Sequence, residues 1–120
     1  MLKQFLLVGV GGAAGSMLRF LTAILTSKFY TGNFPLATFI INIIGCFIIG
    51  LLIARLSITP NDNLKFLLVT GFCGGYTTFS AFSYENVALI NSGHTMLAAA
   101  YIAASVFGGI IAVWLGSIVS

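Results

Sequence analysis

The sequence has 120 residues, of which 59% are hydrophobic and only 6% carry a charge. About 25% of the residues in a soluble domain are charged, and the mean hydropathy of +1.12 is high, so a soluble enzyme and a disordered protein are both disfavoured. The net charge of +3 comes from scattered single bases, which do not form a phosphate-binding patch, so no nucleic acid is expected as a partner. The composition is typical of an integral membrane protein in contact with the lipid bilayer.

Charged residues divide the chain into four apolar stretches. A helix needs roughly 20 apolar residues to cross the hydrocarbon core, so we expect transmembrane helices at about 3–27, 35–56, 63–91 and 95–120. Together they form a single domain over residues 1–120. The apolar run at the start resembles a secretory signal, but no soluble part follows it, and we expect it to be retained as the first span.

The distribution of charge gives only a weak orientation signal. Four spans put both termini on one side, with Lys3, Arg55 and Lys65 against Asp62, while Lys28 lies on the other side. The positive-inside rule places the termini in the cytoplasm. Because the bias is small, such a chain is able to insert in either orientation.

The first expected span combines small residues with one base. Gly11 and Gly15 form a GxxxG pair, which lets helices approach closely in lipid. Arg19 lies past the middle of the span. Its side chain either reaches back to the headgroups or faces an aqueous vestibule, where it would concentrate anions. The same small-residue spacing recurs in Cys46 with Gly50, Gly108 with Ala112, and Ala112 with Gly116.

The second span contains Asn42, whose amide offers two donors and one acceptor. This amide either makes an interhelical hydrogen bond or contacts a ligand. Cys46 and Cys73 lie in separate apolar spans without metal-ligand spacing, and we interpret them as reduced, small hydrophobic residues.

The third span has an unusual centre, where three glycines precede Thr77 and Thr78. One interpretation is close helix packing through Gly71 and Gly75. The other is a broken helix that exposes carbonyl oxygens to an ion or a cavity. The sequence leaves both interpretations open.

Aromatic and hydroxyl residues follow this glycine-rich segment. Phe79 and Phe82 are three residues apart and share a helix face, as do Ser80 and Ser83. Phenylalanines in membrane helices commonly face lipid, but ring edges are electropositive, and hydroxyls donate hydrogen bonds. The pattern therefore also suits a small dehydrated anion. Glu85, the only acid in an expected span, either has a structural role or lies at the interface.

No catalytic or metal-ligand constellation is present, so an enzyme is not expected. Four short helices also enclose little volume, and a pathway across the membrane would need a second subunit.

Three segments, 11–20, 37–47 and 71–85, resemble the Fluc (CrcB) family of fluoride channels. The segment GFCGGYTTFSAFSYE at 71–85 carries most of the resemblance, which extends over nearly the whole chain. It implies an all-α membrane protein of four transmembrane helices, with a break in the third. It also implies an antiparallel, dual-topology dimer, built from two copies or from this chain and an unlike partner. The implied function is passive export of fluoride across a bacterial cell membrane, which relieves fluoride toxicity.

The resemblance also implies roles for individual residues. Phe79 and Phe82 would present ring edges to fluoride, Asn42 would be the pore amide, Arg19 would lie in a vestibule, and Glu85 would lie near the pore entrance. Further polar residues of the fluoride pathway would be Ser80, Ser83, Tyr101 and Ser105.

A structural sodium ion is implied at the centre of the dimer. It would be bound by the backbone carbonyls of Gly74 and Thr77 from both subunits. Two positions depart from the family pattern, because Ala81 and Val113 stand where hydroxyl residues are often found.

Two other functions fit parts of the sequence. A small multidrug transporter has a similar length and four helices, but its first helix carries a glutamate, where this chain has Arg19 and no acid. A non-transporting scaffold would explain the small-residue pairs but not Asn42 or the pattern at 77–83.

Overall fold

The computed structural model describes residues 1–120, which fold into helices without any strand. Three helices are long and apolar enough to cross a membrane: α1 (Leu2–Phe29), α2 (Leu36–Ile58) and α6 (Thr95–Val119). The expectation of an all-α membrane protein is confirmed at this level.

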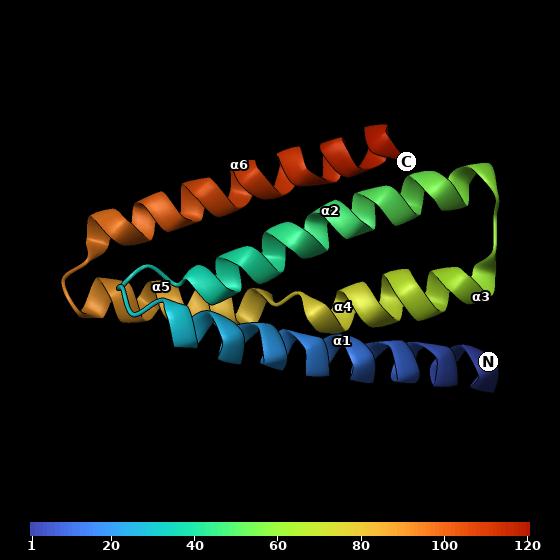
Figure 1. Ribbon diagram of the computed structural model, residues 1–120, viewed down its shortest axis with the longest axis horizontal. Helices are drawn as coiled ribbons and strands as arrows, with labels where there is room; N and C mark the ends of the chain where they lie inside the picture. The colour runs from blue at the N-terminus through green and yellow to red at the C-terminus, as the bar shows by residue number, and fades with distance from the viewer.

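Residues 62–91 form a broken helical run between α2 and α6, here called the broken run. It consists of α3 (Asp62–Leu64), the π-helix η1 (Lys65–Cys73), α4 (Gly74–Tyr76) and α5 (Phe79–Asn91). Thr77 and Thr78 between α4 and α5 are extended, with φ/ψ of −82°/159° and −149°/124°. The broken run extends along α1 and α2, with an open link where α4 ends (Figure 1). The π-helix was not expected from the sequence.

The helices form an elongated bundle of 47 × 29 × 25 Å. Both termini lie at one end, together with the connection from α2 to α3 (Figure 1). The α1–α2 and α5–α6 connections lie at the other end, and Gly93 forms the tight α5–α6 turn with a φ of +86°. Lys3, Arg55 and Lys65 therefore lie at the end opposite Lys28.

Glycines let α1 contact the backbone of the broken run directly. A methyl group on Gly15 would collide with the Phe72 carbonyl, and one on Gly11 would collide with the Leu67 carbonyl. From the other side, a methyl on Gly75 would lie 2.5 Å from the Gly12 carbonyl oxygen. The close packing expected for Gly71 and Gly75 is therefore real, and the helix breaks two residues after Gly75. The segment thus combines close packing with a broken helix.

The second close contact joins α2 to α6. A methyl on Gly50 would collide with the Val113 carbonyl, and one on Gly116 would collide with the Phe47 carbonyl. Helices in lipid gain little from apolar burial against each other, so such backbone contact supplies van der Waals attraction instead. The molecule thus consists of two tightly joined pairs, α1 with the first half of the broken run, and α2 with α6.

An aromatic cluster joins α5 to α6 and to the start of α2. Tyr101 is completely buried, and its ring lies 5.0 Å from that of Phe82 and 5.2 Å from that of Phe34. Leu89 and Ala98 complete this core. Because Phe82 is held by this core, the orientation of its ring is set by the fold.

We expect Gly15→Ala to destabilise the protein more than Gly9→Ala. The added methyl at position 15 meets backbone that cannot rotate away, whereas position 9 has nothing within 4 Å. Overpacking of this kind costs about 1–3 kcal/mol. Thermal unfolding in detergent measures the difference, and equal midpoints for the two variants would contradict the proposed role of the glycine contact.

Candidate functional site

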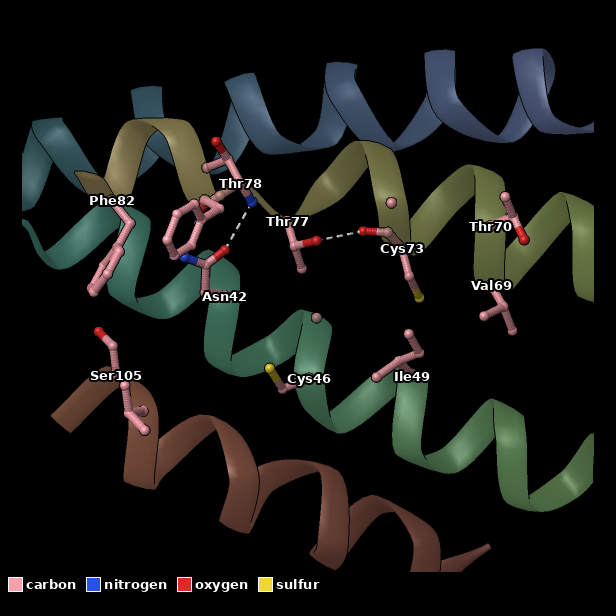
Figure 2. A pocket seen from close by; sticks show the side chains of 14 residues that line it. Asn42, Cys46, Ile49, Val69, Thr70, Cys73, Thr77, Thr78, Phe82 and Ser105 are labelled. Atoms are coloured by element: carbon pink, nitrogen blue, oxygen red, sulfur yellow. Dashed lines mark hydrogen bonds between the residues drawn. The ribbon is translucent and has the colours of Figure 1, made fainter. Parts of the chain in front are cut away.

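An open cavity of about 560 Å³ lies between α2, α6 and the broken run (Figure 2). Its wall consists of 14 residues, none of which is charged or a histidine. Polar atoms come from an amide, several hydroxyls and the exposed backbone of the break. An ion that enters this cavity meets only neutral dipoles.

Asn42 and Thr78 form a two-point contact at the centre of the cavity wall. The Asn42 Nδ2 donates to the Thr78 carbonyl oxygen at 3.0 Å, and the Thr78 N–H donates to Asn42 Oδ1 at 2.9 Å. Figure 2 shows the Asn42 side chain directed from α2 toward Thr78. An asparagine amide nitrogen carries two hydrogens, so one remains free for another acceptor. The interhelical hydrogen bond considered for Asn42 is therefore present, and a donor is left over.

This contact changes the backbone pairing of α4. In a continuous helix the Thr78 N–H would donate to the Gly74 carbonyl four residues earlier, but here it donates to Asn42. The Thr77 N–H and hydroxyl both donate to the Cys73 carbonyl, at 3.0 and 2.8 Å. The Gly74 carbonyl is therefore left without its helical donor. The position that a Cβ on Gly74 would occupy is open space.

The break also creates a new helix N-terminus at the cavity. Thr78 is the N-cap of α5, and its hydroxyl accepts from the Ala81 N–H at 3.2 Å. The N–H groups of Phe79 and Ser80 belong to the first helical turn, where no carbonyl precedes them within the helix. Because Thr78 and Phe79 line the cavity, this electropositive helix end lies at its wall.

Two phenylalanines and one serine complete the polar half of the cavity. The rings of Phe79 and Phe82 are 5.7 Å apart and inclined at 39°. Phe79 is 78% exposed at the open side. Ser105 of α6 faces Phe82 (Figure 2), and its hydroxyl is buried without any hydrogen-bond partner. An unpaired buried hydroxyl is costly, which makes Ser105 a ready donor to a ligand.

Small residues shape the other half of the cavity. Gly45 makes room for the Thr77 methyl, with which a side chain at position 45 would collide. Cys46 and Cys73 are free cysteines and both line the cavity. Their being free agrees with the interpretation of both as reduced, small residues, but their place at a cavity was not expected. Cys46 is four residues after Asn42, and this helical spacing was the signal for a shared face.

Glu85 and Tyr101 lie outside the cavity wall, in a separate polar cluster. The Tyr101 hydroxyl donates to Glu85 Oε1 at 2.9 Å, and the Thr38 hydroxyl donates to Oε2 at 2.7 Å. Thr38 was missed in the sequence, although it is one helical turn before Asn42. Both Glu85 oxygens are thus held by donors from α2 and α6.

Three further residues that were expected at the site, Ser80, Ser83 and Arg19, do not line the cavity. The Ser80 hydroxyl is exposed and 3.3 Å from the Thr78 hydroxyl. Ser83 is half-buried on α5, and Arg19 is half-buried on α1. The structure therefore gathers Asn42, Gly74, Thr77, Phe79, Phe82 and Ser105 at one cavity.

These features define an all-helical, multi-pass membrane protein with an uncharged cavity beside a broken helix. Residues 6–117 match the family described as CrcB-like protein, Camphor Resistance (CrcB). The chain belongs to this family.

Relatives support this assignment. The protein of Flavobacterium psychrophilum named fluoride-specific ion channel FluC is 46% identical, covering 99% of this chain and 98% of its own length. A protein of the same name from Azobacteroides pseudotrichonymphae is 44% identical, covering 100% and 98%. A third, from Prosthecochloris aestuarii, is 47% identical, covering 92% and 88%. All three names describe ion channels.

We expect Asn42→Leu to destabilise the protein by roughly 1–3 kcal/mol, because it leaves the Thr78 N–H and carbonyl unpaired. Amide hydrogen exchange at Thr78 should also accelerate. Ser105→Ala is the matched control, since its hydroxyl has no partner to lose. Thermal unfolding and hydrogen exchange measure both variants, and an Asn42→Leu protein as stable as Ser105→Ala would refute the importance of this contact.

Proposed function

We propose that this chain is a fluoride-selective ion channel that passively exports fluoride across the cell membrane and so relieves fluoride toxicity. The observation that carries the proposal is the uncharged cavity that collects neutral hydrogen-bond donors and phenyl rings. The names of relatives that are 44–47% identical over nearly their full lengths agree with it.

The donors at the cavity suit a small anion. The free Asn42 N–H, the unpaired Ser105 hydroxyl and the N-terminal end of α5 all offer positive dipoles at or beside one cavity. The edges of the Phe79 and Phe82 rings are electropositive as well. Conduction requires binding strong enough to replace water yet weak enough for release. Neutral dipoles meet both requirements better than a lysine would.

The other site residues are assigned supporting positions along the same path. Ser80 and Ser83 are proposed to supply hydroxyls where the path continues along α5. Glu85 is proposed to lie at the pore entrance, and Tyr101 to contribute to the path beside it. The bond from Tyr101 to Glu85 would have to exchange for fluoride to reach that hydroxyl. Arg19 is proposed to attract anions at a vestibule.

Liposomes that contain the purified protein should release fluoride rapidly and chloride slowly. Phe79→Ile and Phe82→Ile should each reduce fluoride efflux by roughly tenfold or more, because the aliphatic side chain lacks the ring edge. Phe107→Ile is the matched control, since Phe107 is an exposed phenylalanine on α6 outside the cavity. A fluoride electrode measures the rates. If the liposomes release no fluoride, or release chloride equally fast, the channel proposal is wrong. Unchanged rates in both phenylalanine variants would show that these rings do not line the fluoride path.

The working unit is proposed to be an antiparallel dimer of four-span subunits. The broken run would be the fourth crossing, since it extends along the full-length helices (Figure 1). Only 16 of the 120 residues are buried, and the cavity is open on one side, so a second copy would close it. The small charge difference between the two ends supports insertion in both orientations. If the partner were a different CrcB-family chain, the purified complex would be a heterodimer of two unlike chains.

A structural sodium ion is proposed at the centre of this dimer. The residues fit such an ion, because the break frees the Gly74 carbonyl from helical pairing and leaves open space beside it. Unwound carbonyls commonly coordinate sodium in membrane proteins. The carbonyls of Gly74 and Thr77 from two copies would supply oxygen ligands, and the ion would offset their mutual repulsion.

Replacement of sodium by N-methylglucammonium should lower the thermal midpoint of the purified dimer, because the large cation cannot enter a site between backbone carbonyls. Potassium at equal ionic strength serves as the control for salt effects. Midpoints that are identical in all three salts would contradict the sodium site while leaving the fluoride proposal intact.

A further inference from the structure

A second groove lies away from the central cavity, between the start of α1 and η1. Its volume is about 500 Å³, and its wall is almost entirely apolar. Leu2, Leu6 and Val10 of α1 form one side, and Leu67 of η1 forms the other. Lys3 is the only charged residue in the wall.

The α1 side of this groove is a continuous apolar stripe. Leu2, Leu6 and Val10 are spaced by four residues, so they stand above one another on one helix face. They are 73%, 60% and 64% exposed. The stripe spans about 12 Å along the helix axis. Its length and apolar character match part of a lipid acyl chain that lies along α1.

The position of the groove separates it from the fluoride cavity. The cavity residues Val69, Cys73 and Thr77 point toward α2 and α6, whereas α1 lies behind the broken run on the opposite side (Figure 2). A second subunit that closes the cavity would therefore leave the α1–η1 groove facing lipid.

One end of the groove carries unbalanced positive charge. Lys3 lies in its wall, and Lys65 begins η1 at the same end of the bundle. Arg55, in the last turn of α2, lies at the same end of the bundle, and Asp62 is the only acidic side chain there. Basic residues at the membrane surface attract anionic headgroups, and basic pockets between transmembrane helices bind them specifically.

We propose that the α1–η1 groove binds an anionic phospholipid of the bilayer. One acyl chain lies along Leu2, Leu6 and Val10, and the phosphate lies at Lys3, the one basic residue in the groove wall. The lipid would cover the α1 stripe and fasten α1 to η1 at the end where the glycine contacts of Gly11 begin.

Native mass spectrometry of the intact protein tests this proposal with two lipids that share the same acyl chains, phosphatidylglycerol and phosphatidylcholine. The wild-type protein should retain phosphatidylglycerol preferentially. Lys3→Gln should reduce that preference about fivefold. Lys28→Gln at the opposite end is the matched control and should keep the preference. Equal retention of both lipids by the wild type, or an equal loss of preference in Lys28→Gln, would overturn the site.

A second pair of variants tests the groove itself. Leu6→Trp should fill the groove and reduce phosphatidylglycerol retention, while Ile110→Trp on an exposed face of α6 should not. Undiminished retention in Leu6→Trp would show that the lipid is held by charge alone and would refute the groove as its binding site.

Discussion

The hydrogen bonds between Asn42 and Thr78 are the interaction on which the rest of the site depends. One side chain from α2 replaces both the donor and the acceptor that a continuous third helix would supply at this point. Unpaired backbone groups are costly at membrane depth, so a break there needs such a substitute. With the amide in place, α4 is able to end and α5 to begin inside the bundle. The cavity, the free carbonyl of Gly74 and the new N-terminus of α5 all follow from that exchange.

A broken helix gives one segment two opposite electrostatic characters. The end of α4 presents carbonyl oxygens, which favour a cation, and the start of α5 presents N–H groups, which favour an anion. The two ends are separated only by Thr77 and Thr78. Neutral dipoles therefore serve both proposed ions, and the cavity wall needs no formal charge. This agrees with a chain in which only 6% of residues are charged.

The sequence was most informative where one physical constraint dominated. Apolar length predicted four membrane-spanning helices, of which α1, α2 and α6 are long and continuous, and the spacing of Gly11 and Gly15 predicted close contact of α1. The alternatives for Asn42 and for the glycine-rich segment stayed open, because a single sequence does not show which backbone group an amide meets. The π-helix had no signal, since i→i+5 pairing leaves no distinct residue pattern. The cluster of Thr38, Glu85 and Tyr101 depends on three separate helices, so only tertiary structure reveals it.

The central claim is that the Asn42 amide both holds the break and offers a donor to fluoride. Fluoride efflux from liposomes that contain Asn42→Asp tests this claim most directly. An ionised aspartate still accepts from the Thr78 N–H, but it has no N–H for the Thr78 carbonyl or for an anion, and it adds negative charge to the cavity. We expect efflux to fall by roughly tenfold or more at equal protein content, given the cost of unpaired polar groups. Efflux at the wild-type rate would contradict the account.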